Sequence, residues 1–448
     1  MTIWSTISRS RPPSPGRTTE SRWRKTCLPL LFVLLGLVFA AWAARIPAVR
    51  DGLHLSAGQL GLALLCAGVG GLASFPLAAA MVARYGQARA ALCGGTALLV
   101  ALACIGCSAN LPALMASLGL LGAAASCFDV AINAIGAIAE KKAGRSIMSM
   151  LHAWFCVGTV SGALSGSVIA GQGISPQAHF LTLAAIMALP LWLSCRTLAA
   201  AAGAEDAARD GHRDDAPAGA VDAAAVAAAT AATAATADSG AGATATVTTE
   251  RRRGHGRFRL LPRPLLILGL IGFFGAIAEN GIADWSGLFM RDHMGAAVGI
   301  APLGYAGFTG AMLLMRLVAD RLKDRFGARR VVAGGALVAV AGIGIAVGAQ
   351  WLGAVIGVDG ATLPLAIGGF ALAGAGLAGV FPFVFSAGGA AGPSALAGVA
   401  TISYFGALVG PPVIGFLAQY AGLQAALGSL ALLCLALGMI ASRAKALV

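Results

Sequence analysis

Twelve apolar runs, each long enough to cross a lipid bilayer, constrain this 448-residue chain more than any other feature. A membrane-spanning helix needs about 20 consecutive, mostly apolar residues. The chain is 58% hydrophobic and only 11% charged, whereas the surface of a soluble fold must be largely polar. We therefore predict an all-α membrane protein with twelve transmembrane helices, at roughly 27–47, 58–82, 90–108, 112–139, 148–171, 178–198, 264–289, 300–320, 329–350, 362–386, 396–418 and 423–442.

The basic residues gather on one side of the predicted spans. Of the 31 Lys and Arg residues, only Arg45, Arg50 and Arg291 fall on the opposite side, and Arg316 lies within a span. This positive-inside bias predicts that both chain termini are cytoplasmic. The net charge of +13 then reflects orientation and contact with anionic lipid headgroups, so we expect no nucleic-acid partner.

A long polar segment separates the sixth span from the seventh. It contains Ala/Thr-rich low complexity such as AAAVAAATAATAATADSG (223–240), without apolar periodicity that could be buried. We interpret the segment as a cytoplasmic linker. The predicted divisions are a cytoplasmic N-terminal tail (1–26), an N-terminal six-helix half (27–198), the linker (199–263), a C-terminal six-helix half (264–442) and a cytoplasmic C-terminal tail (443–448).

The two halves repeat each other. AWAARIPAVRDGLHLSAGQLG (41–61) and DWSGLFMRDHMGAAVGIAPLG (284–304) each run from a Trp to a Leu-Gly with the same spacing and an Arg-Asp pair between them. Internal repeats in a many-span protein are typical of secondary transporters, in which the solute site lies between the halves near the membrane midplane.

No pattern of catalytic or metal-binding residues accompanies these spans. The nine cysteines lie almost wholly within predicted spans, and Cys104 and Cys107 have no second pair to complete a metal site. The chain has no hydrolase triad, phosphate-binding loop or metal-ligand spacing. We therefore expect no enzyme activity, no metal and no cofactor.

The loop after the eighth predicted span, DRLKDRFGARR (320–330), resembles the loop signature of the major facilitator superfamily. Asp324, Arg325 and Gly327 fill that pattern, followed by Arg329 and Arg330. In the first half the copy is degraded, because Ala79 and Ala83 replace its glycine and its aspartate, although Arg84, Gly86 and Arg89 remain. The resemblance covers nearly all of the chain outside the tail and the linker, and it implies the two-half, twelve-helix fold of this superfamily.

The segment FDVAINAIGAIAEKKAGRSIMSMLHAWFCVG (128–158) looks like the fucose permease branch of the superfamily. Asp129, Asn133, Arg145 and His152 match its acid, its asparagine, its Gly-Arg loop and a polar residue entering the fifth span. ENGIADWSG (279–287) and AARIP (43–47) look like bacterial inner-membrane relatives of that branch. The resemblance implies proton-coupled movement of a small solute, with sugars as the best-known cargo. The chain departs from that branch at Ala134, where the branch has a proline.

Asp129 is the most informative charge in the fourth span. On a helix it shares one face with Asn133, Gly136 and Glu140, while the other faces are apolar. A charge at the bilayer centre costs about 2.5–3.5 kcal/mol, and burial favours the protonated carboxyl. We predict that Asp129 couples protons or binds solute; the alternative is a structural carboxyl bonded to a neighbouring helix. Asn133 suits a hydroxylated solute, and interhelical hydrogen bonding is an equal alternative.

Polar residues in the seventh and fifth spans complete the candidate site. Glu279 is the second predicted proton-coupling residue, because it is the deeper acid of its span. Trp is enriched at membrane interfaces, so Trp42 and Trp285 are either interface anchors or surfaces for stacking on a sugar. A membrane histidine such as His152 is more often a packed hydrogen-bonding group than a proton carrier. The predicted solute-binding residues are Asn133, His152, Trp154, Asn280, Asp284, Trp285 and Trp42.

Charges near the cytoplasmic ends are predicted to gate the site. In the superfamily such charges bridge the halves when the cytoplasmic side is closed. Arg316, Asp320, Arg321 and Asp324 lie along the end of the eighth span, with i,i+4 spacing between 316 and 320 and between 320 and 324, so a salt-bridge ladder can form along the helix. The predicted gating residues are Glu140, Arg145, Arg84, Arg89, Arg316, Asp320, Arg321, Asp324 and Arg325.

These observations together predict a secondary transporter that works by alternating access. The preferred interpretation is a proton symporter for a small polar solute such as a sugar, acting as a monomer in a bacterial inner membrane. The first alternative is a proton-driven exporter of metabolites or toxic compounds. The second is a membrane receptor or scaffold without transport activity, although a scaffold has no need to bear the insertion cost of acids within its spans.

Overall fold

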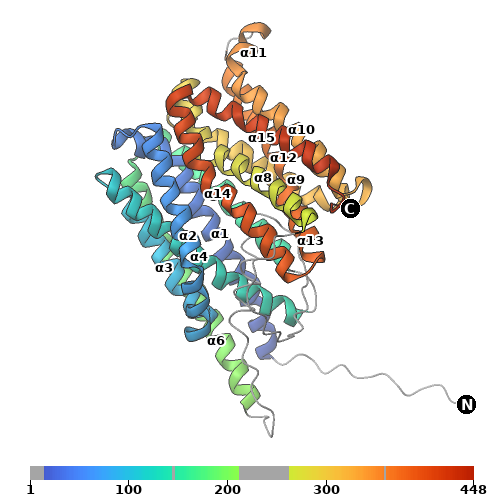
Figure 1. Ribbon diagram of the computed structural model, residues 1–448. Helices are drawn as coiled ribbons and strands as arrows, with labels where there is room; N and C mark the ends of the chain where they lie inside the picture. Colours follow the sequence, from blue (N-terminus) through green and yellow to red (C-terminus); the bar gives the residue numbers. More distant parts are fainter. Residues whose placement is uncertain (1–14, 144–146, 211–261, 358–359, 448) are drawn as a thin grey trace, which may run out of the picture.

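The computed structural model describes residues 15–143, 147–210, 262–357 and 360–447. Of the predicted tail, linker and gating residues, 1–14, 211–261 and Arg145 lie outside the described residues. Figure 1 shows two bundles of helices side by side, one coloured blue to green and the other yellow to red.

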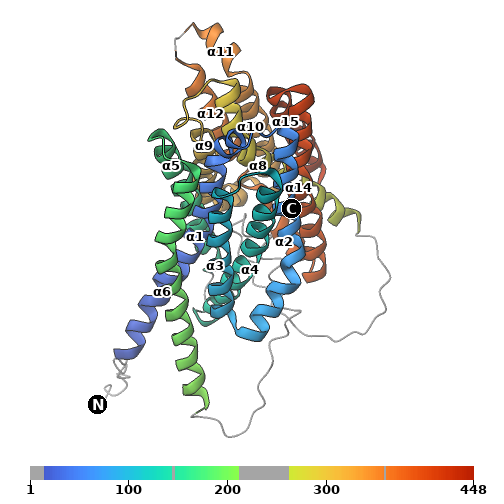
Figure 2. The same ribbon diagram turned by 90° about the vertical axis from the view of Figure 1, so that its left-hand side faces the viewer.

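Six long helices make up the first bundle. In chain order they are α1 (Pro15–Gly52), α2 (Ala57–Tyr85), α3 (Gln87–Gly106), α4 (Leu111–Ala143), α5 (Met148–Gly171) and α6 (Pro176–Asp210). Helix α1 begins within the predicted N-terminal tail, and α6 continues beyond the predicted end of its span at residue 198. Figure 2 shows these two helices projecting from the same end of the bundle.

The second bundle repeats this arrangement with more interruptions. It contains α8 (Arg263–Leu288), the π-helical turn η1 (Phe289–His293), α9 (Leu303–Phe326), α10 (Ala328–Val347), α11 (Ala349–Ile356), α12 (Thr362–Leu377), α13 (Val380–Ala390), α14 (Pro393–Ala421) and α15 (Leu423–Arg443). The predicted span 362–386 is divided into α12 and α13. Pro382 lacks the N–H that would bond to the carbonyl of Ala378, so the helix breaks there.

The number of spans agrees with the prediction. In the described part of the chain, 11 segments are long and apolar enough to cross a membrane. Helix α9 has 24 residues, but its charges, including Arg316 and Asp320, lower its hydropathy. With α9 the described chain provides twelve spans, and the predicted fold class is confirmed.

Helix pairing follows an approximate two-fold relation between the bundles. Contacts between α1 and α5, α2 and α4, and α3 and α6 in the first bundle correspond to those of α8 with α14, α9 with α12, and α10 with α15 in the second. Between the bundles, α2 packs on α14 and α5 packs on α9, which are equivalent contacts. The sequence repeat is therefore also a structural repeat.

Small residues allow α1 and α5 to approach closely. A Cβ atom on Gly162 would lie 2.6 Å from the carbonyl oxygen of Leu37 and 2.8 Å from Cβ of Ala40. One turn on, a Cβ on Gly166 would lie 2.6 Å from Cβ of Ala44. The small-xxx-small spacing of Gly158, Gly162 and Gly166 thus serves helix packing, as interhelical glycines do in membranes.

Candidate functional site

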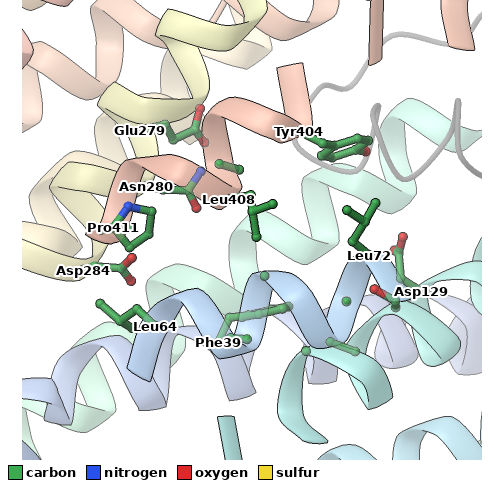
Figure 3. A pocket seen from close by; sticks show the side chains of 18 of the residues that line it. Phe39, Leu64, Leu72, Asp129, Glu279, Asn280, Asp284, Tyr404, Leu408 and Pro411 are labelled. Carbon is green, nitrogen blue, oxygen red and sulfur yellow. The ribbon is translucent and has the colours of Figure 1, made fainter. Parts of the chain in front are cut away.

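A cavity of about 920 Å³ lies between the bundles. Its walls come from α1, α2, α4 and α5 on one side and from α8, α9 and α14 on the other. Figure 3 shows acidic side chains on opposite walls, with Asp129 on α4 and Glu279 and Asp284 on α8. Volumes of roughly 300–1,000 Å³ are typical of sites for small molecules. The cavity therefore has the size and position of a solute site.

Asp129 lines this cavity, and Asn133 supports it from behind. The side-chain amide of Asn133 donates hydrogen bonds to Oδ1 of Asp129, at 2.8 Å, and to its backbone carbonyl, at 2.9 Å. Asn133 itself is buried and is not part of the cavity wall. The spacing of four residues places the amide one helical turn below the carboxyl, so Asn133 contacts Asp129 and does not face the cavity.

Glu279 and Arg316 form an ion pair on the opposite wall. Oε1 of Glu279 on α8 lies 3.8 Å from Nη2 of Arg316 on α9. Nη1 of Arg316 donates to Sγ of Cys156 on α5, at 3.1 Å, and thereby reaches across to the first bundle. All three residues line the cavity. A predicted gating residue and a predicted proton-coupling residue are therefore neighbours in one site.

Of the other six predicted solute-binding residues, three line the cavity and three do not. Asn280, Asp284 and Trp42 belong to the wall, and the Asn280 amide donates to the carbonyl of Ala276 at 2.9 Å. Trp285 is fully buried against α14 and does not line the cavity. Trp285 lies on the face of α8 that packs against α14, whereas Asp284 lies on the face towards the cavity.

His152 and Trp154 do not line the cavity either. His152 is buried and packs edge-on against Phe32 of α1, with ring centroids 5.3 Å apart. Trp154 is 41% exposed and points away from the interior. The cavity meets α5 at Phe155, Cys156 and Thr159. His152 lies one turn before this face, where α1 covers it, and Trp154 lies on the outer face of the helix.

The predicted gating charges are dispersed in this conformation. Glu140 accepts hydrogen bonds from the backbone N–H groups of Ile147 and Met148, at 2.8 and 3.0 Å, and so caps the start of α5. In the described part of the chain, Arg316 pairs with Glu279 and not with Asp320, so the expected ladder along α9 is absent. Asp320 is exposed, and so are the other predicted gating residues Arg84, Arg89, Arg321, Asp324 and Arg325.

Four charges without a predicted role lie together in the structure. Nη2 of Arg291 lies 2.6 Å from Oδ2 of Asp51, and Arg50 forms an ion pair with Asp292. Nη2 of Arg50 also lies 2.8 Å from Oδ1 of Asp51. We call Arg50, Asp51, Arg291 and Asp292 the outer cluster. The signal for it was present in the sequence, because the same Arg-Asp pair occurs in the equivalent loop of each half.

A two-bundle helical fold with a central, partly charged cavity defines a membrane carrier. The family model described as Major Facilitator Superfamily matches residues 27–400. The chain belongs to the major facilitator superfamily, as its loop signature suggested. It is a multi-pass membrane protein, and the general activity of its family is the movement of small solutes across membranes.

Two curated relatives share about a third of their residues with this chain. An uncharacterised MFS-type transporter of Yersinia pestis is 31% identical over 412 residues, which are 91% of this chain and 92% of the relative. The uncharacterised transporter y4wD of Sinorhizobium fredii is 30% identical over 403 residues, covering 88% and 90% of the two chains. These relatives support transport and identify no solute.

A solved structure supports the fold. A mutant of the nucleoside transporter NupG superposes with a TM-score of 0.68 at 13% sequence identity, covering 94% of this chain and 99% of NupG. At this identity the likeness concerns the fold and not the solute.

Proposed function

We propose that this protein is a proton-coupled symporter that moves a small polar solute, such as a sugar, by alternating access. The observation that supports this most is the contact of Glu279 with Arg316 on the cavity wall, where Arg316 also touches Cys156 of the other bundle. A proton taken up by Glu279 removes the charge that attracts Arg316. Protonation at this position would therefore release Arg316, whose other hydrogen bond reaches Cys156 of the first bundle.

Asp129 is the second proposed proton site. Its carboxyl is only slightly exposed, and it lies on the wall that faces Glu279 across the cavity. In such surroundings the charged and the neutral carboxyl differ strongly in free energy, and changes in cavity hydration during a cycle alter that difference. The protonation state of two carboxyls on opposite walls would thus depend both on the proton concentration and on the conformation of the cavity.

The remaining polar groups suit a hydroxylated solute. The amide of Asn280 and the carboxyl of Asp284 offer hydrogen-bond donors and acceptors on one wall. Trp42 offers an aromatic surface on another, next to Phe39. We further propose that the protein acts as a monomer in a bacterial inner membrane, with both termini cytoplasmic.

Proton movement on addition of solute tests the proposal directly. A thermal-shift screen against sugars, sugar acids and amino acids first identifies a solute, because binding stabilises the folded protein by mass action. We then expect that adding this solute to proteoliposomes without a pH gradient draws protons into the vesicles together with it. Solute uptake without any proton movement would contradict symport.

The aromatic composition of the cavity wall supports a second candidate function, a proton-driven exporter of metabolites or toxic compounds. Phe39, Phe75, Phe273, Phe308 and Phe405 give the wall an extensive aromatic surface suited to amphipathic compounds. An exporter that exchanges protons for its cargo would move protons in the direction opposite to the solute. The same proteoliposome measurement therefore distinguishes the two functions by the sign of the pH change.

The loop signature at the end of α9 (320–330) provides a further prediction. Asp324 is exposed in this conformation, in which the proposed gate at this end would be open. We expect Asp324→Asn to slow solute uptake roughly five-fold or more, because the closed gate would lose its acid. Ala83→Asn, at the equivalent place in the first half, serves as the matched control. Equal uptake rates for Asp324→Asn and Ala83→Asn would contradict the gating role.

A further inference from the structure

The outer cluster joins the two bundles reciprocally. Arg50 and Asp51 lie in the last turn of α1 in one half, and Arg291 and Asp292 lie in η1 at the equivalent place in the other. Arg50 pairs with Asp292 while Arg291 pairs with Asp51, so each half supplies one cation and one anion to the other. The side chains are 22–34% exposed, and water reaches them at the surface of the bundle.

Other contacts between the halves lie at this same end. The backbone N–H of Gly58 on α2 donates to Oε1 of Gln419 on α14, at 3.0 Å. A Cβ atom on Gly61 would lie 3.0 Å from the carbonyl oxygen of Pro411, so the two helices touch at their backbones. The hydroxyl of Ser167 on α5 donates to the carbonyl of Gly299.

The cavity begins just below these contacts and extends away from them. Leu64 on α2 and Pro411 on α14 line it at the level where the halves meet. On the same two helices it continues past Leu72 to Phe75, and past Phe405 to Ala397. The halves are therefore joined at the end that carries the outer cluster and diverge towards the other end.

We propose that Arg50, Asp51, Arg291 and Asp292 form an outer gate that holds this end closed and has to separate once in every transport cycle. This inference rests on the alternating-access mechanism proposed above. Ion pairs between partly exposed side chains are individually weak. A few such pairs suit a gate, because together they stabilise the closed conformation only modestly and the gate can still open.

Reversing the sign of both arginines tests the gate. In Arg50→Asp/Arg291→Asp, the cluster becomes four acids that repel one another. We expect hydrogen exchange at the outer ends of α2 and α14, residues 57–61 and 411–419, to become about ten-fold faster than in wild type. The measurement is hydrogen-exchange mass spectrometry on the full chain in lipid nanodiscs. It requires no solute, so it stands or falls independently of the proposed symport.

Two further variants serve as controls. The fourfold inversion Arg50→Asp/Asp51→Arg/Arg291→Asp/Asp292→Arg keeps every attractive pair, and we expect it to restore wild-type exchange. Arg196→Asp/Arg443→Asp changes the charge equally on two exposed residues, one in each half, and should leave the outer ends unaffected. Wild-type exchange in the four-acid variant, or a folded inversion that does not restore exchange, would overturn the proposal.

Ionic strength gives a second measurement on the unmodified protein, which applies even when the four-acid variant does not fold. At about 1 M salt the screening length falls to about 3 Å, and exposed ion pairs weaken. We expect exchange at residues 57–61 and 411–419 to accelerate with salt, while exchange at the buried α1–α5 contact stays constant. Exchange at the outer ends that is independent of salt would count against a gate made of these charges.

Discussion

Asp129→Asn should abolish solute accumulation driven by a pH gradient while leaving exchange of solute across the membrane intact. The asparagine keeps the size of the side chain, and its carbonyl oxygen can accept the 2.8 Å hydrogen bond from Asn133. It cannot release a proton, so it imitates the protonated state at every step. A carrier fixed in that state can still bind and exchange solute, but an imposed pH difference no longer drives it.

Counterflow and pH-driven uptake, measured on the same proteoliposomes, separate this outcome from a structural role. A purely structural carboxyl predicts less folded protein, with coupling intact in whatever inserts. Asp129→Glu serves as the matched control, because it keeps a titratable group and should retain pH-driven accumulation at a reduced rate. Normal accumulation by Asp129→Asn would remove Asp129 from the coupling mechanism and leave Glu279 as the candidate.

Gly162→Leu should prevent the first bundle from packing. Any Cβ at this position approaches the carbonyl oxygen of Leu37 to 2.6 Å, and a leucine would add further atoms against α1. Overpacking of this kind typically costs about 1–3 kcal/mol and occasionally more. Because the obstacle is backbone, a rotamer change cannot relieve it. We therefore expect a marked loss of folded, monodisperse protein.

Size-exclusion chromatography and thermal melting of the purified variants measure this effect. Gly334→Leu is the matched control, because a Cβ on Gly334 in α10 meets no atom within 4 Å and the residue is exposed. It should melt close to wild type. A Gly162→Leu protein that melts at the temperature of Gly334→Leu would show that α1 and α5 are not held as closely as their glycines indicate.

Local properties of the chain were sufficient to predict its helices. Twelve runs of adequate length and hydropathy predicted the spans, because a span depends only on residues near one another in sequence. The spacing of Gly158, Gly162 and Gly166 is a local signal of the same kind for a close helix contact. The break between α12 and α13 follows from Pro382, a local signal that was not used.

Contacts between distant helices were harder to predict. Arg316 has an acid four residues away, yet it pairs with Glu279 on another helix. Periodicity showed that Asp129 and Asn133 share a face, but not that one would support the other from behind the wall. For Asp284 and Trp285, the pattern did not indicate which of two neighbours faces the cavity. These choices depend on the relative rotation of packed helices, which no short stretch of sequence encodes.

The reciprocal pairing of the outer cluster has a consequence for how such a molecule can arise. Residue contacts of the form i with j and j with i are those of a symmetric dimer, in which one surface recognises its own copy. A single six-helix protein with an Arg-Asp pair at the end of its first helix would therefore present matching cations and anions to a second copy. After duplication and fusion of the gene, both halves still carry the Arg-Asp pair that this contact requires. The inner loops have instead diverged, with Asp324 in one half and Ala83 in the other. The asymmetry that a working cycle requires would then have accumulated at one end of the molecule, while the other end kept the ancestral two-fold contact.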